Sequence, residues 1–144
     1  MSKLQRKQEV ESRPRMLVVE DDDDYRSALI RTISKLNRDR GWEILALSNI
    51  RDAEMAVSHA TVDVVVTDYH LPDGLGTSLT RRTPSRNGKA QRILLSGDTE
   101  GVQRAWRDEP DIADDIWDKA WELQAISDRL DATMARVEFC RYWT

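Results

Sequence analysis

Acidic, hydroxyl and basic side chains stand directly after short apolar runs at four points of the chain. The residues in these places are Glu20 and Asp21, Asp68, Ser96, and Asp118 with Lys119. Carboxylates brought together repel one another and raise at least one pKa unless a cation relieves them. Magnesium suits such a site, because it is usually held by one or two carboxylates together with waters and a phosphate.

The same residue types could carry out phosphoryl transfer. A carboxylate beside a metal ion can act as a nucleophile toward phosphorus and form an acyl phosphate. Lys119 and the Ser96 hydroxyl can bind the oxygens of the transferred group, whose transfer depends mainly on positioning and electrostatics. A plainer interpretation stays open, in which the run 22–24 is a solvated helix cap and Ser96 and Lys119 are turn and surface residues.

Alternating elements are expected to position these residues. The pattern predicts strands over 16–19, 42–47, 62–66, 92–95 and 113–118, and helices near 25–36, 51–59, 76–82, 99–107 and 121–138. Such alternation implies a parallel sheet covered on both faces. Ligands of these sheets lie outside the carboxyl ends of the strands, so the polar residues should converge there.

Composition excludes several classes of protein. With 144 residues, 40% apolar and 33% charged, the chain is one domain that is neither disordered nor a membrane protein. The net charge of -4 argues against direct nucleic-acid binding. The single Cys140 and the lack of a secretory signal predict a cytoplasmic protein. Residues 1–14 are predicted to be a flexible polar tail, and 15–144 the domain.

Four segments resemble a response-regulator receiver domain, the phosphoacceptor half of a two-component signalling pair. They are MLVVEDD, VDVVVTDYHLPDG, ILLSG and DIWDK, in the family's order and at its spacing. The resemblance runs from about Met16 to Phe139. It implies a flavodoxin-like α/β fold, a doubly wound five-stranded parallel sheet in the order 2-1-3-4-5 with five helices.

The resemblance also implies roles for single residues. Asp68 is expected to be phosphorylated by a histidine kinase, with Glu20, Asp21, Asp68 and the backbone carbonyl of His70 as ligands of Mg²⁺. Ser96 is expected to be the switch hydroxyl and Lys119 the phosphate-binding lysine.

The sequence departs from the family at three places near its lysine. Ala120 follows Lys119 where the family usually has a cis proline, and Ile116 stands where an aromatic switch residue is usual. Asp118 places a charge in a strand that is normally apolar. The chemistry is expected to be intact and the signal output altered.

Three tryptophans fall in the region that meets partners in the resembling family. Trp106, Trp117 and Trp121 are predicted either to form an exposed partner face or to belong to the core.

The main hypothesis is a single-domain receiver, not an enzyme. It would take a phosphoryl group from a sensor histidine kinase or phosphotransfer protein and signal to a downstream effector protein, with a homodimer as a further option. The alternative is a pseudo-receiver that signals without phosphorylation. A haloacid-dehalogenase-like phosphatase is a weaker third hypothesis, because His70 stands where that chemistry needs an acid.

Overall fold

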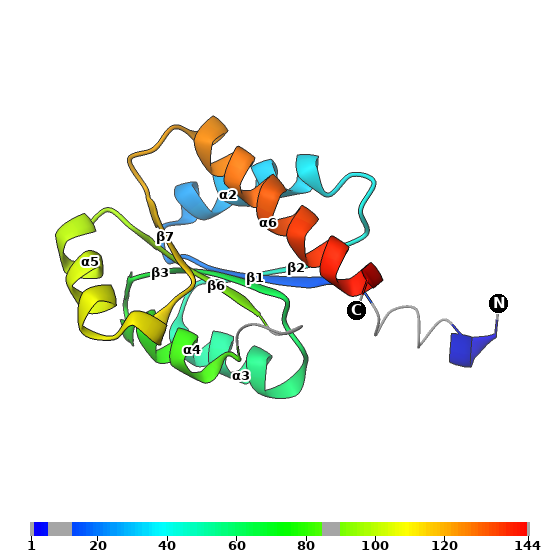
Figure 1. Cartoon of the computed structure of the whole chain (residues 1–144), viewed down its shortest axis with the longest axis horizontal. Coiled ribbons are helices and arrows are strands. Elements are labelled where there is room, and N and C mark those ends of the chain that lie inside the picture. The colour runs from blue at the N-terminus through cyan, green and yellow to red at the C-terminus, as the bar shows by residue number, and fades with distance from the viewer. Residues whose placement is uncertain (1, 6–12, 85–89, 144) are drawn as a thin grey trace.

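The computed structural model describes residues 2–5, 13–84 and 90–143, and its main sheet has five parallel strands (Figure 1). These strands are β1 (Arg15–Val19), β2 (Glu43–Leu47), β3 (Val64–Asp68), β6 (Gln91–Ser96) and β7 (Asp115–Asp118). Their order across the sheet is β2-β1-β3-β6-β7, which confirms the predicted order 2-1-3-4-5. The three central strands are buried along almost their whole length, as their unbroken apolar runs indicate.

Helices cover both faces of the sheet. They are α2 (Asp23–Leu36), α3 (Ile50–His59), α4 (Thr77–Arg82), α5 (Thr99–Asp108) and α6 (Leu123–Trp143). In Figure 1, α2 and α6 lie together above the sheet, α3 and α4 lie below it, and α5 lies toward its left-hand end. All five predicted helices are present. The 3-10 helix η1 (Pro110–Ile112) and the antiparallel pair β4 (His70–Leu71) and β5 (Gly74–Leu75) were not predicted, because such short pieces show no period.

Trp117 lies in the core between the sheet and α6. It is 1% exposed and belongs to the same buried cluster as Ile126 and Leu130 of α6. Its indole N–H donates to Asp115 Oδ2 at 2.9 Å. The prediction that Trp117 could contribute to an exposed partner face is therefore wrong. Side chains alternate along a strand, so Trp117 faces the α6 side while Ile116 packs on the α5 side.

The other two tryptophans are half-buried. The indole N–H of Trp106 on α5 donates to the backbone carbonyls of Pro110 and Ala113 at 3.1 and 3.2 Å. Trp121 packs against the cluster between the sheet and α6, and the Arg129 guanidinium lies 4.3 Å from its ring centroid. Both rings have intramolecular partners, and their place in a partner face stays a prediction.

The predicted tail over residues 1–14 lies largely outside the described residues. Within it, residues 3–5 form a helical turn. The flexibility of the tail and the domain boundary at residue 15 stay predictions. Among the helices of the described ranges, none combines the length and the apolar character needed to cross a membrane.

Candidate functional site

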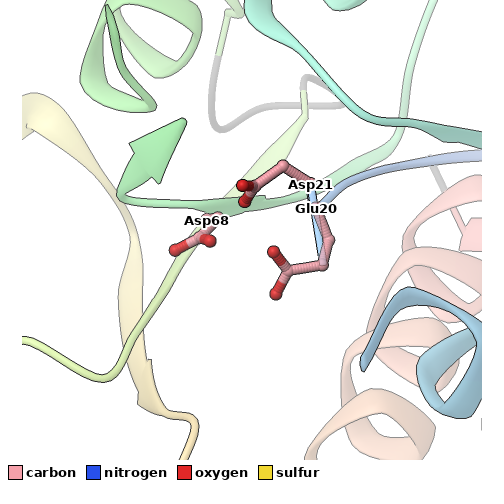
Figure 2. Close-up of side chains that lie close together, drawn as sticks. All are labelled: Glu20, Asp21 and Asp68. Atoms are coloured by element: carbon pink, nitrogen blue, oxygen red, sulfur yellow. The ribbon is translucent and has the colours of Figure 1, made fainter. Parts of the chain in front are cut away.

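Three carboxylates meet at the carboxyl edge of the sheet (Figure 2). Glu20 and Asp21 follow β1, and Asp68 is the last residue of the neighbouring β3. One carboxylate oxygen from each residue lies within 4.8 Å of the others. Glu20 is fully buried and Asp68 is 6% exposed, whereas Asp21 is exposed. The carboxylate cluster is therefore shielded from solvent at Glu20 and Asp68 and open to solvent at Asp21.

Lys119 reaches this cluster from the loop after β7. Its Nζ lies 2.8 Å from Asp68 Oδ2 and is also ion-paired with Glu20 Oε1. The backbone N–H of Lys119 donates to the Ser96 carbonyl at 3.0 Å, which continues the pairing of β6 and β7 one residue beyond the strand. The ammonium thus bridges the two buried carboxylates.

The charges in the cluster are only partly balanced. Burial raises the pKa of Glu20 to about 7, against the opposing effect of the Lys119 hydrogen bond and with a further rise caused by Asp68. Burial alone would lower the pKa of Lys119, but hydrogen bonds to Asp68 and Glu20 outweigh it and raise that pKa. One ammonium therefore does not fully offset two buried carboxylates, and a second cation would stabilise the ionised form of Glu20.

The donor set fits a hard divalent cation. Glu20, Asp21 and Asp68 offer only oxygen atoms, and Mg²⁺ is usually held by one or two carboxylates and several waters. The predicted backbone ligand, His70, lies in β4 two residues after Asp68. Its side chain is exposed, and its Nε2 lies 2.9 Å from Asp98 Oδ2. Ligation by the His70 carbonyl stays a prediction.

Ser96 ends β6 at the same edge of the sheet. Asp68 is paired in register with Leu95, so Ser96 lies one residue further along the neighbouring strand. The Ser96 hydroxyl is buried and accepts a hydrogen bond from the backbone N–H of Asp98 at 2.8 Å. Its oxygen is thus engaged with the start of α5, while its own O–H remains a donor that can turn.

The loop after β3 folds back over Asp68. The backbone N–H of Gly76 donates to the Tyr69 carbonyl at 2.7 Å. This bond brings Gly76 so close to the Asp68 carbonyl that a Cβ at position 76 would collide with it. The glycine is therefore required by the close approach of two backbone segments.

Asp73, in the same loop, caps a different helix. Its carboxylate accepts hydrogen bonds from the backbone N–H groups of Ile50 and Arg51 at 2.9 and 3.0 Å. The bond from Ile50, together with that from Arg51, lowers the pKa of Asp73. The sequence around Pro72 indicated a turn, but no local signal showed that the carboxylate of Asp73 would reach the first turn of α3.

Tyr25 was not predicted to belong to the site, yet its ring lies beside Lys119. Lys119 Nζ is 5.0 Å from the ring centroid. The one available signal was its position in the first turn of the helix that follows Glu20 and Asp21. The Lys119–Ala120 peptide bond nearby is trans, since the described residues contain no cis bond.

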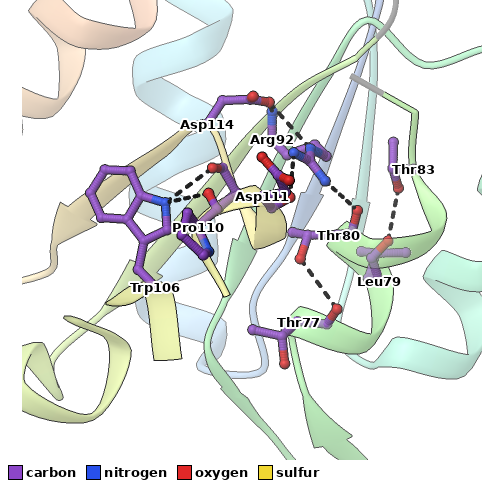
Figure 3. A network of polar contacts seen from close by, with 10 residues as sticks. Thr77, Leu79, Thr80, Thr83, Arg92, Trp106, Pro110, Asp111 and Asp114 are labelled. Carbon is purple, nitrogen blue, oxygen red and sulfur yellow. Dashed lines mark hydrogen bonds and ion pairs between the residues drawn. The ribbon is translucent and has the colours of Figure 1, made fainter. Parts of the chain in front are cut away.

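A second polar network lies at the opposite edge of the sheet, around a buried arginine (Figure 3). Arg92, the second residue of β6, is 6% exposed and pairs with Asp114 at 3.2 Å. Its guanidinium also donates to the Thr80 carbonyl of α4 at 3.0 Å and to the Asp111 carbonyl of η1 at 2.8 Å. This network ties two segments to the sheet far from the carboxylate cluster.

Comparison with curated proteins identifies relatives that regulate transcription. The virulence transcriptional regulatory protein PhoP of Salmonella typhimurium is 29% identical over 127 residues, covering 85% of this chain and 52% of that protein. The transcriptional regulatory protein PhoP of Escherichia coli is 28% identical over 127 residues, with the same coverage. The chain spans about half the length of the curated relatives it matches.

Solved structures share the fold, and a family model matches most of the sequence. The non-phosphorylated HemR receiver domain from Leptospira biflexa aligns with a TM-score of 0.65 and 26% identity, covering 84% of this chain and 94% of that one. A CheY-like receiver domain from Methylobacillus flagellatus aligns with a TM-score of 0.66 and 20% identity, covering 84% and 98%. The family model for the response regulator receiver domain matches residues 16–131, and the chain therefore belongs to this family of two-component signalling proteins.

Proposed function

We propose that Asp68 accepts a phosphoryl group from a phosphohistidine of a sensor histidine kinase or phosphotransfer protein. The observation that carries this proposal is the convergence of Asp68 with Glu20, Asp21 and Lys119 at one edge of the sheet. Receiver domains are signalling phosphoacceptors rather than classical enzymes, and this arrangement supplies the parts that such an acceptor needs.

The transfer forms an acyl phosphate on Asp68. A carboxylate oxygen attacks phosphorus, the bond from phosphorus to the donor nitrogen breaks, and the imidazole leaves with the electron pair. Lys119 binds a phosphoryl oxygen as the Asp68 carboxylate loses its negative charge on forming the acyl phosphate. The Ser96 O–H turns to donate to another phosphoryl oxygen while its oxygen still accepts from Asp98.

The carboxylate cluster fits Mg²⁺ as the cofactor. Glu20, Asp21 and Asp68 would hold the ion with the His70 carbonyl, and the bound ion would neutralise charge on the phosphoryl oxygens. The raised pKa of Glu20 supports this role, because ionised Glu20 needs a further cation beside Lys119.

The output is proposed to pass through protein contacts to a downstream effector, or through a homodimer. Ser96 and Ile116 are the proposed switch positions. The half-buried Trp106 packs in the same cluster as Ile116, and the half-buried Trp121 packs against the cluster between the sheet and α6, so we propose these two rings as part of the partner face. A change at this face is a shift between two populated conformations that phosphorylation favours unequally. We place this signalling in the cytoplasm, without direct contact to nucleic acid.

The test is phosphorylation by a small donor. Wild type and Asp68→Asn are incubated with acetyl phosphate and Mg²⁺, and intact mass is measured. One added phosphoryl group is expected on wild type only, and only when Mg²⁺ is present. Modification of both proteins, or of neither, would contradict the assignment of Asp68.

Two departures favour a second candidate, a pseudo-receiver that signals without phosphorylation. Ile116 provides no aromatic ring that could move inward as the Ser96 hydroxyl shifts toward the phosphoryl group. Ala120 replaces the usual proline. In this case wild type would remain unmodified by acetyl phosphate, and Asp68→Asn would bind the same protein partners with unchanged affinity.

A further inference from the structure

Tyr25 belongs to the first turn of α2, directly after the acidic run. Its backbone N–H donates to Oδ1 of Asp22, the N-cap residue, at 2.9 Å, so the start of the helix fixes the position of Tyr25. Its half-buried ring packs against the core cluster that joins α2, the sheet and α6. The proposed roles of Glu20, Asp68 and Lys119 leave this ring without a function.

The ring adds a third attraction to the surroundings of Lys119. Lys119 Nζ lies 5.0 Å from the ring centroid and also contacts the carboxylates of Asp68 and Glu20. A cation within about 6 Å of an aromatic centroid is attracted by the electron-rich face of the ring. Because the lysine side chain is long and flexible, the two carboxylates alone allow its ammonium more than one position.

The hydroxyl group does not account for the placement of Tyr25. Its oxygen is buried and has no hydrogen-bond partner within the described parts of the chain. Burial raises the pKa of the phenol, so the side chain stays neutral at pH 7. The group that acts on Lys119 is therefore the face of the ring.

We propose that Tyr25 is a positioning residue of the phosphoryl site, where the face of its ring holds the Lys119 ammonium beside the acceptor Asp68. This inference rests on the proposed phosphoacceptor function. Before transfer the Lys119 ammonium is paired with the negatively charged Asp68 carboxylate. After transfer this carboxylate is part of an acyl phosphate and no longer carries that charge. The ring contact persists through both states, so Lys119 has less freedom to lose when it binds the phosphoryl oxygen.

The experiment compares three variants of the full chain. Tyr25→Phe keeps the ring, Tyr25→Leu removes it, and Ile30→Ala is the control, because Ile30 packs against the same cluster from the same helix. NMR measures the ring-current shift of the Lys119 Hε protons, and acetyl phosphate with Mg²⁺ gives the phosphorylation rate. In Tyr25→Leu we expect the Hε shift to vanish and the rate to fall about tenfold. Both readouts should stay near wild type in Tyr25→Phe and Ile30→Ala.

Fluorinated phenylalanines at position 25 provide a second series that keeps the shape of the side chain. Each added fluorine weakens the attraction of the ring for a cation, so the rate should fall stepwise. An unchanged rate across this series, or an Ile30→Ala rate as low as that of Tyr25→Leu, overturns the role of Tyr25. Failure of wild type itself to be phosphorylated contradicts the proposed function instead, so the two failures are distinguishable.

Discussion

The carboxylate of Asp118 accepts a hydrogen bond of 2.8 Å from the backbone N–H of Ala120, two residues further along the chain. These residues account for two of the departures from the family pattern, and the bond links them. A proline at position 120 would have no N–H to donate, so Asp118 and Ala120 together order the loop that carries Lys119. The Asp118 carbonyl also accepts from the Trp121 N–H at 3.1 Å, which closes the turn into α6.

Removal of the Asp118 carboxylate should loosen this loop. In Asp118→Ala the Ala120 amide loses its partner, at a cost of about 1 kcal/mol in the local opening free energy. Hydrogen exchange of the Ala120 amide should be faster by about fivefold, and phosphorylation by acetyl phosphate should be slower. Asp118→Asn is the matched control, because its amide oxygen can still accept the bond. Equal exchange rates in wild type and Asp118→Ala would show that the carboxylate does not order the loop.

Mg²⁺ should stabilise the protein more at pH 8 than at pH 5.5. The pKa of Glu20 is raised from its ordinary value of 4.5 to about 7, so between these values the folded state binds more protons than the unfolded state. Without metal, the contribution of Glu20 to stability therefore falls as pH rises through this window and stays low above it. A cation that holds Glu20 ionised removes this loss, so the stabilisation of the folded state by Mg²⁺ is largest at high pH.

Thermal unfolding with and without Mg²⁺ at several pH values measures this effect. Glu20→Gln, which cannot ionise, should lose the pH dependence that belongs to this residue and weaken the response to Mg²⁺. If Mg²⁺ raises the melting temperature equally at pH 5.5 and pH 8, Mg²⁺ binding does not depend on the ionisation of Glu20, which contradicts this prediction.

The sheet and the convergence of the site could be predicted because both follow from the same pattern. Val64, Val65 and Val66 form an unbroken apolar run, and such a run indicates a strand buried on both faces. The residues that follow neighbouring parallel strands meet at the same edge of the sheet. Glu20 and Asp68 were therefore expected to lie together before any contact was known.

The missed features depend on contacts between distant segments. Trp117 and Asp118 are adjacent in a short strand, and nothing local shows which of them faces α6. Arg92 is the second residue of a strand that its sequence predicts well. Its burial nevertheless depends on carbonyls of α4 and η1 that only the tertiary fold brings near. The contact of Tyr25 with Lys119 likewise joins residues far apart in sequence.

Loss of Arg92 should destabilise the fold without changing the chemistry. In Arg92→Met the half-buried Asp114 carboxylate loses its ion pair and two backbone carbonyls lose their donors, which should cost about 2–4 kcal/mol. Phosphorylation of the folded fraction should stay at the wild-type rate, because the network lies at the other edge of the sheet. Chemical denaturation and acetyl phosphate kinetics measure the two effects. A slower reaction at full folding would indicate coupling between the two edges.

The phenol of Tyr25 should be dispensable for stability. Its buried oxygen has no partner among the described residues, so Tyr25→Phe removes a group that is desolvated without compensation. The variant should be more stable by about 1 kcal/mol, which raises the melting temperature by about 2–4 °C for a domain of this size. A lower melting temperature would mean that the hydroxyl has a partner, such as an ordered water, that stabilises the native state.

Gly76 should be the least replaceable glycine of the site. In Gly76→Ala the new Cβ meets the carbonyl of Asp68, which is backbone and cannot turn aside, so the acceptor strand and its loop must separate. Overpacking of this kind costs about 1–3 kcal/mol, and the displaced acceptor should be phosphorylated up to about a hundredfold more slowly. Gly97→Ala is the matched control, because it lies at the same edge of the sheet and a Cβ there meets nothing within 4 Å. Chemical denaturation and acetyl phosphate kinetics on both variants decide the matter. Equal losses in the two would trace the effect to backbone flexibility, whereas a loss confined to Gly76→Ala traces it to the contact between this loop and Asp68.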